Sequence, residues 1–257
     1  MAAKYDTIGN NYAALRKPDP RIARIIEKAL GSAQTIVNVG AGTGSYEPAD
    51  RFVTAVEPSA AMIAKRDPAA PAAIQASAGD LPFPDKSFDA AMAILTIHHW
   101  PDKAQGLREM RRVTRGPMVL LTFDPAQRPW LTDYLPELAA LDEKQMPHMS
   151  DYERWLDPVQ VTPVPVPHDC SDGFLYAWWR RPEAYLDPFT RTGSSSFWAL
   201  PDIEAGLQRL RQDLESGAWQ RRYADLLARD EYDAGYRLVV AKGGAARAAP
   251  PGLTILP

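Results

Sequence analysis

The sequence has 257 residues, 46% of them hydrophobic, which is enough for one substantial core with a modest helical addition but not for two full domains. A formal net charge of −3 does not favour nucleic acid as a partner. The single cysteine, Cys170, excludes an internal disulfide, and no Cys/His spacing indicates a metal site. The chain has no run of about twenty apolar residues and no secretory signal near its first residue, so we expect a cytoplasmic protein without membrane contacts.

The first third of the chain alternates helix and strand patterns. Apolar residues at helical spacing, followed by Gly31, predict an amphipathic helix over 19–30. Short β-branched runs then predict buried strands over 35–40 and 51–58, and a weaker run predicts a third strand over 72–78.

The pattern continues with the most apolar strand of the chain, over 90–97, then a helix over 102–113 and a strand over 117–124. Strands that alternate with helices at these spacings indicate right-handed parallel crossovers. Residues 235–242 form a late strand with no room for a following crossover helix. We therefore expect this strand to pair antiparallel or to lie at an edge.

Short helical patterns rich in Trp and Tyr lie between the strand over 117–124 and the late strand over 235–242, with one candidate strand near 161–168. We expect a core over 1–128, a helical cap and substrate region over 129–230, a final core strand over 231–243 and a disordered tail over 244–257. The predicted fold is α/β. It has a doubly wound, mostly parallel seven-stranded sheet, an antiparallel last strand and helical insertions that form a cap.

A glycine-rich turn follows the first strand, at the edge of the sheet where α/β proteins bind ligands. It contains Gly40, Ala41, Gly42 and Gly44. Glycine lets the backbone approach a ligand closely, although ordinary tight turns also use it. Glu57 and Pro58 end the second strand, where a carboxylate can accept two hydrogen bonds from ribose hydroxyls. A surface acid before a proline is the alternative.

A glycine turn and an acid at the end of a strand fit both dinucleotide oxidoreductases and methyltransferases. Three details favour the second class. Ser45 stands where the dinucleotide fingerprint needs its third glycine. Asp80 and Leu81 follow the third strand and suit the amino group, the face and the edge of an adenine. The antiparallel last strand also departs from an all-parallel dinucleotide sheet.

Over 35–124 and 235–242 the chain resembles the class I (Rossmann-like) S-adenosylmethionine-dependent methyltransferases of the small-molecule, methyltransferase type 11-like kind. The motifs are VNVGAGTG, AVEPS, AGDLPFPDKSFDAAMAILTIHHW and REMRRVTRGPMVLLTFDP. The resemblance implies S-adenosyl-L-methionine as cofactor and S-adenosyl-L-homocysteine as product. It assigns the three glycines to the methionine part, Glu57 to the ribose, and Asp80 with Leu81 to the adenine. Asn38 stands where the family usually has an acid, and its amide can organise the loop by hydrogen bonding.

The segment before the first helix carries Tyr5, Tyr12 and Arg16. In similar proteins this segment folds over the cofactor. Arg16 suits the cofactor carboxylate and an aromatic ring such as that of Tyr12 suits its cation, with Tyr5 near the acceptor. A surface helix with ordinary charges is the alternative.

The fourth strand ends in a run that, in this fold, faces the sulfonium methyl. It contains Leu95, Thr96, His98, His99 and Trp100. We assign the first two to the cofactor and Trp100 to the acceptor. His98 or His99 is a candidate base, although aligned reactants need none and histidines here often only pack. Because adjacent strand residues face opposite ways, we expect at most one of the two histidines to point into the site.

Aromatic residues of the cap, among them Phe174, Trp178 and Trp179, are candidates for a wall around a flat acceptor, with core packing as the alternative. No Asn/Asp-Pro-Pro-Tyr motif indicates a nucleic-acid amino methyltransferase. We expect methyl transfer to O, N or C of a small metabolite of indole or phenol type, in secondary metabolism, by a monomer or homodimer. The alternatives are an NAD-dependent oxidoreductase with an atypical glycine loop and an inactive cofactor-binding protein.

Overall fold

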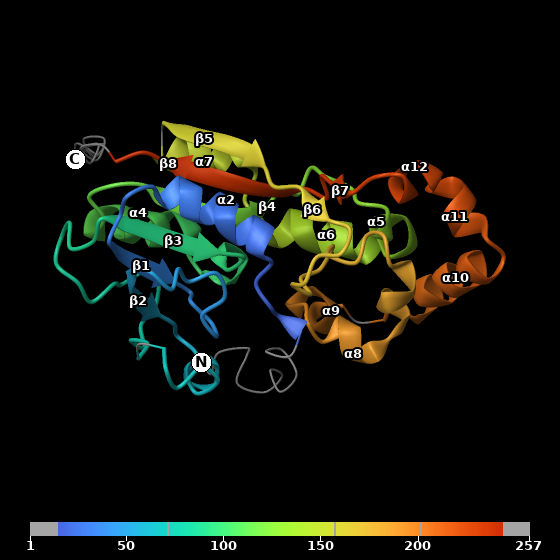
Figure 1. The fold of residues 1–257 in the computed structure, drawn as a ribbon, viewed down its shortest axis with the longest axis horizontal. Helices are drawn as coiled ribbons and strands as arrows, with labels where there is room; N and C mark the ends of the chain where they lie inside the picture. The colour runs from blue at the N-terminus through green and yellow to red at the C-terminus, as the bar shows by residue number, and fades with distance from the viewer. Residues whose placement is uncertain (1–14, 71, 157, 201, 244–257) are drawn as a thin grey trace, which may run out of the picture.

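The computed structural model describes residues 15–243 except 71, 157 and 201, so Tyr5, Tyr12 and the expected tail lie outside the described residues. A six-stranded sheet of order β2-β1-β3-β4-β8-β5 forms its centre (Figure 1). The strands are β1 (Thr35–Val39), β2 (Phe52–Val56), β3 (Ala90–Ile94), β4 (Met118–Phe123), β5 (Val159–Pro163) and β8 (Tyr236–Ala241). Among the described residues, no helix has the length and apolar character needed to cross a bilayer.

The sheet is parallel except for its last strand in the sequence. β1 pairs in parallel with β2 and β3, and β3 pairs in parallel with β4. β8 runs antiparallel to both β4 and β5, which confirms the predicted direction of this strand and leaves β5 at the edge. The class I arrangement expected from the sequence is therefore present.

The expectation of seven strands was wrong, because the segment 72–78 makes one bridge, from Ile74 to Val56, in place of a strand. The bridge has two hydrogen bonds, from the Glu57 N–H to the Ile74 carbonyl (3.0 Å) and from the Ile74 N–H to the Ala55 carbonyl (2.9 Å). Ile74 is 37% exposed, so this edge offers little apolar burial to extend the pairing.

Helices cover both faces of the sheet because consecutive strand residues point to opposite sides. The helix α2 (Pro20–Leu30) buries its apolar stripe against one face, together with residues such as Ile36 and Met92. On the other face, α4 (Lys103–Val113) and α7 (Met149–Leu156) pack on their sequence neighbours, such as Val37 and Ala91.

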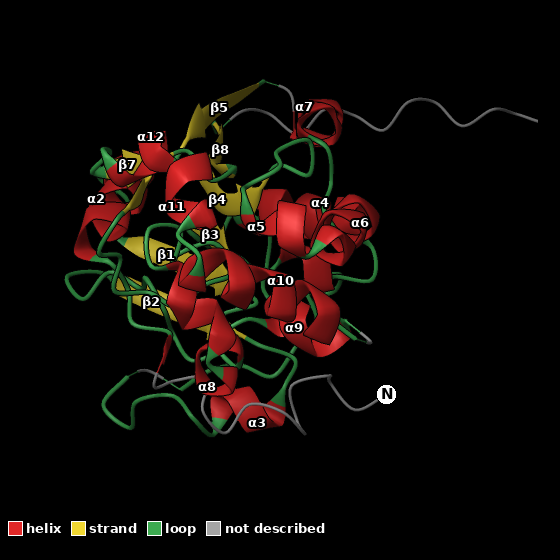
Figure 2. Cartoon of the chain, turned by 90° about the vertical axis from the view of Figure 1, so that its right-hand side faces the viewer, coloured by secondary structure: helices red, strands yellow, loops and turns green. Residues whose placement is uncertain are grey.

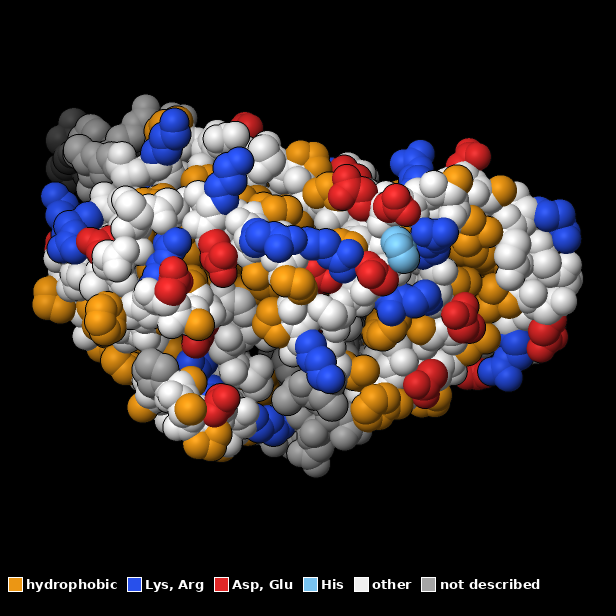
Figure 3. All heavy atoms as spheres, in the orientation of Figure 1, with side chains coloured by type: hydrophobic (Ala, Val, Ile, Leu, Met, Phe, Trp, Pro, Cys, Tyr) orange, Lys and Arg blue, Asp and Glu red, His pale blue; other side chains and the backbone are white. Residues whose placement is uncertain are grey.

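The helices that follow β4 in the sequence, apart from α7, gather at one end of the molecule, beyond the carboxyl end of β3, and we call them the cap (Figures 1 and 2). They are α5 (Leu131–Tyr134), α6 (Pro136–Gln145), α8 (Pro188–Arg191), α9 (Ser195–Ala199), α10 (Glu204–Glu215), α11 (Ala218–Arg222) and α12 (Ala224–Leu227). A 3₁₀ turn, η3 (Pro182–Leu186), and a two-stranded ribbon of β6 (Val166–Pro167) and β7 (Glu231–Tyr232) accompany them. The predicted strand over 161–168 is thus divided between two sheets. On the face seen in Figure 3, acidic and basic side chains are interspersed, without a field of one sign.

Candidate active site

A cavity of about 460 Å³ lies at the carboxyl ends of β1, β2 and β3, within the size range of small-molecule sites. It is lined by the glycine loop, the ends of the three strands, the turn at Ser77 and Ala78, and the 3₁₀ turn η2 (Ile97–His99). The predicted site residues that it brings together are Arg16, Asn38, Gly40, Ala41, Gly42, Glu57, Pro58, Leu95, Thr96, His98, His99 and Trp100.

The glycine loop needs glycine for two reasons at Gly40. Its φ of +73° lies in the left-handed region, and a Cβ at this position would clash with the side-chain hydroxyl of Thr96, which lies just after the neighbouring strand β3. Gly42 and Gly44 also have positive φ values, of +53° and +96°. At the glycine positions the loop therefore presents backbone without a side chain.

Glu57 holds the loop to the next helix, α3 (Ala60–Ile63). Its side chain is buried, and one carboxylate oxygen accepts a hydrogen bond from the Gly42 N–H (2.8 Å) while the other accepts from the Ser59 N–H (2.9 Å). A carboxylate has about four acceptor sites, so these two hydrogen bonds alone do not fill its acceptor capacity.

A partly buried acid, Glu47, lies beside Asn38. The Asn38 amide donates to Glu47 (2.9 Å), and Arg66 binds the same carboxylate through two nitrogens (2.7 and 3.1 Å). The Asn38 side-chain oxygen is buried and has no hydrogen-bond partner among the described residues. Sequence reasoning missed Glu47 because it lies in the loop after the glycines, away from any motif.

The turn that follows residues 72–78 differs from expectation. Leu81 is 2% exposed, and its N–H donates to the carboxylate of Glu109 (2.9 Å), so in this structure that N–H is not offered to an adenine. Hydrogen bonding to Arg112 lowers the pKa of Glu109, which keeps it a charged acceptor. Ser77 and Ala78 line the cavity instead, and the role of Asp80 stays a prediction.

The strand β3 ends at Ile94, three residues earlier than predicted, because Leu95 takes a φ of +50° and a 3₁₀ turn follows. Side chains in such a turn are about 120° apart rather than on opposite faces. His98 and His99 accordingly both line the cavity, with ring centroids 3.9 Å apart, so the expectation that at most one would point into the site was wrong.

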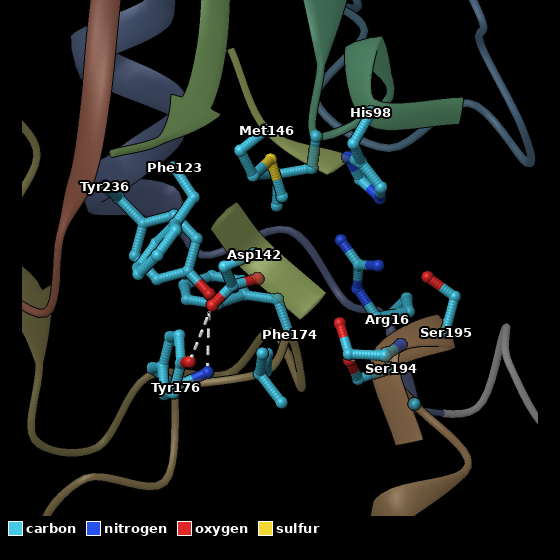
Figure 4. A pocket seen from close by; sticks show the side chains of 14 residues that line it. Arg16, His98, Phe123, Asp142, Met146, Phe174, Tyr176, Ser194, Ser195 and Tyr236 are labelled. Atoms are coloured by element: carbon cyan, nitrogen blue, oxygen red, sulfur yellow. Dashed lines mark hydrogen bonds between the residues drawn. The ribbon is translucent and has the colours of Figure 1, made fainter. Parts of the chain in front are cut away.

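A second, smaller cavity of about 50 Å³ adjoins the first under the cap (Figure 4). Arg16, Leu95 and His98 line both cavities. The aromatic wall of the smaller cavity consists of Phe123, Phe174, Tyr176 and Tyr236. Phe174 and Tyr176 belong to the aromatic cluster of the cap that the sequence indicated. Phe123 and Tyr236 were not anticipated, because they come from the strands β4 and β8.

Trp178 and Trp179 line neither cavity. Trp179 is 1% exposed and its indole N–H donates to the Val166 carbonyl (3.0 Å). The Trp178 ring instead stacks with the Arg181 guanidinium, at 4.2 Å from the ring centroid. Both contacts favour the packing alternative, and the assignment of the two residues to the acceptor stays a prediction.

Arg16 reaches the site already bound to a carboxylate. Two of its guanidinium nitrogens donate to Asp172, at 2.6 and 3.3 Å, and Asp172 is fully buried. The Tyr46 hydroxyl donates to the same acid (2.9 Å). Arg16 is thus fixed at the junction of the two cavities by a partner far away in the sequence.

Asp142 is a buried acid in the smaller cavity that sequence reasoning missed. It comes from α6, is 3% exposed, and accepts a hydrogen bond from the Tyr176 hydroxyl (2.9 Å). Burial raises the pKa of Asp142 to about 6. Its spacing of four residues from the buried Leu138 was the available signal.

Metal ligation has no support in the described part of the chain, where no cluster of three His, Cys, Asp or Glu side chains could hold an ion. Cys170 is buried, and burial raises the pKa of its thiol to about 12, which suits a packing role.

Comparisons with known proteins agree with this geometry. Residues 37–118 match the family described as "Methyltransferase domain". A solved structure from Anabaena variabilis, described as a methyltransferase from an antibiotic biosynthesis pathway, is 38% identical, with a TM-score of 0.81 over 88% of this chain and 98% of that chain. The YcgJ protein from Bacillus subtilis, 18% identical over 86% of this chain and 97% of its own with a TM-score of 0.52, shares the fold.

A curated relative matches over a shorter stretch. The ubiquinone/menaquinone biosynthesis C-methyltransferase UbiE of Hahella chejuensis is 43% identical over 58 residues, which is 22% of this chain and 23% of that protein. The match therefore spans about a quarter of the relative.

Proposed function

The chain belongs to the class I S-adenosylmethionine-dependent methyltransferases, and from this premise we propose that it methylates O, N or C of a small aromatic acceptor of phenol, indole or quinone-like type. The cofactor is S-adenosyl-L-methionine. The observation that carries the acceptor class is the small cavity walled by aromatic rings, which joins the cofactor cavity at His98. Family membership also sets aside the dinucleotide oxidoreductase alternative.

The larger cavity fits the cofactor. The loop at Gly40 and Gly42 would follow the methionine part, Glu57 would accept the ribose hydroxyls, and the unpartnered oxygen of Asn38 would accept from an ammonium group. When bound, the cofactor supplies an electrophilic methyl group on a sulfonium. The roles of Gly44, Asp80 and Leu81 in binding remain predictions.

His98 is the favoured base of the two histidines, because it lines both cavities whereas His99 lines only the larger of these two. In this position it takes the proton that the acceptor loses on methylation. A positioned base contributes about 10²–10⁴-fold, and holding acceptor and methyl in line contributes more.

Other features support a small-molecule acceptor. A net charge of −3 gives no attraction for a nucleic acid. The relatives' descriptions name quinone biosynthesis and an antibiotic pathway, which fits an acceptor with a ring system and a role in secondary metabolism. We propose that the protein acts in the cytoplasm as a monomer or homodimer.

The acceptor class is tested with labelled cofactor and a panel of phenols, indoles, hydroquinones, aliphatic amines and aliphatic acids. Release of S-adenosylhomocysteine and transfer of label to aromatic members are expected. Label on the aliphatic members alone would refute the proposal.

The base is tested with His98→Asn, and the neighbouring His99→Asn is the matched control. We expect kcat to fall about 10²–10⁴-fold in the first variant and to change little in the second, with cofactor affinity kept in both. Equal losses in the two variants would contradict the assignment.

A further inference from the structure

The smaller cavity contains one carboxyl group, that of Asp142, among the side chains that line it. The Tyr176 hydroxyl fixes one oxygen of this group at 2.9 Å (Figure 4). The other oxygen accepts no hydrogen bond from any side chain or backbone group that the structure describes. The pocket is thus built around a fixed acid with one acceptor atom available.

The two arginines nearest in charge effect to Asp142, Arg16 of the cavity wall and Arg128, each have another carboxylate as partner. Arg16, the arginine among the side chains that line the cavity, is paired with Asp172 at 2.6 Å. The charge of Arg128 attracts the Asp142 carboxylate from beyond ion-pair distance, and the Arg128 guanidinium lies 3.4 Å from the carboxylate of Glu143.

The other groups facing Asp142 from the wall are the His98 ring and the hydroxyls of Tyr176 and Tyr236. Within the described ranges, Asp142 has no ion-pair partner. A buried carboxylate without a cation is costly, so a ligand cation would be favoured here.

The aromatic wall suits the same kind of ligand. The ring centroids of Phe123 and Tyr176 are 5.1 Å apart, and those of Phe174 and Tyr236 are 4.6 Å apart. Phe123 and Tyr236 join the two pairs, with centroids 5.5 Å apart, so the four rings form a continuous surface. Ring faces attract ammonium groups and also pack against a flat apolar body.

We propose that Asp142 binds the ammonium group of an acceptor that has an aromatic ring with an alkylammonium side chain, at the end of the pocket away from the cofactor. This inference rests on the proposed function and narrows its substrate class. Asp142 lines the smaller cavity and not the larger, whereas His98 lines both, so the amine is held on one side while the reacting atom lies at the junction. Asp142 therefore sets specificity rather than taking part in proton transfer.

The experiment compares tyramine with para-ethylphenol, which has the same ring and chain length without the ammonium group. Dissociation constants are measured in the presence of S-adenosylhomocysteine, and methyl transfer is measured with labelled cofactor. We expect the wild-type protein to prefer tyramine. In Asp142→Asn, which keeps an oxygen for the Tyr176 hydroxyl but loses the charge, tyramine affinity falls about ten- to a hundredfold and para-ethylphenol affinity stays unchanged.

Two further variants separate recognition from folding. Tyr176→Phe keeps the charge and removes the hydrogen bond, so the preference for tyramine persists. Asp213→Asn is the matched control, because Asp213 accepts from the Tyr134 hydroxyl (2.6 Å) in the same cap but lines neither cavity. It leaves both affinities unchanged.

The outcomes that overturn the inference are distinct from those that overturn the proposed function. If wild type and Asp142→Asn show the same ratio of affinities for the two compounds while a phenol is methylated, Asp142 has no role in recognition and the proposed function stands. If cofactor binds but no aromatic compound is methylated, the proposed acceptor class fails and the inference fails with it.

Discussion

Replacing Asp142 by Asn should stabilise the protein at alkaline pH. Burial raises the pKa of Asp142 from its usual 3.8 to about 6, so the folded protein binds this proton more tightly than the unfolded chain does. The free energy of unfolding therefore falls as the pH rises from about 4 to about 6, and it stays lower above that window. A shift of about two pKa units corresponds to roughly 3 kcal/mol.

Asn is neutral at every pH and its carbonyl oxygen can still accept from the Tyr176 hydroxyl. The variant should thus be more stable than wild type by up to ~3 kcal/mol at pH 8, and nearly equal to it at pH 4. Urea unfolding of both proteins without cofactor, followed by tryptophan fluorescence, measures this difference at each pH. All other titrating groups cancel in the comparison.

The reasoning is refuted if the stability difference between the two proteins is constant over this pH range. A variant that is less stable than wild type at pH 8 would also refute it, because the charged carboxylate would then be contributing favourably to the fold.

Two further predictions concern the cofactor cavity. Gly40→Ala should abolish measurable S-adenosylhomocysteine binding in calorimetry, because a positive φ costs alanine about 1–2 kcal/mol and the new Cβ clashes with Thr96. The double variant with Thr96→Ala should recover part of the binding. No recovery would show that the clash is unimportant. In Glu57→Gln an amide can accept from the Gly42 N–H or the Ser59 N–H but not from both, so cofactor affinity should fall about ten- to a hundredfold, and unchanged affinity would contradict the site.

Much of the sheet could be predicted because parallel strands covered on both faces are nearly continuous apolar runs. This holds for β1, β3 and β4, which have few exposed positions. The bridge at Ile74 was overestimated as a strand because its segment has the composition of a strand, whereas Ile74 stays 37% exposed at the edge of the sheet. Pairing at an edge depends on what covers it, which the local sequence does not contain.

The site residues also divide into those that local sequence predicts and those that it does not. The glycine loop and Glu57 follow from backbone conformation and from their place at strand ends, which are local properties. The sequence could not place Trp178 and Trp179, because an aromatic residue has the same composition signal whether it packs in a core or lines a cavity.

The sequence by itself determined the doubly wound core, the glycine loop and the family, because periodicity and turn chemistry act over a few neighbouring residues. Only the tertiary structure decided that Asp142 of α6, His98 of η2 and Tyr236 of β8 share one cavity. That proximity arises from the packing of the cap on the ends of the strands, and such long-range contacts leave no mark in the spacing of any one segment.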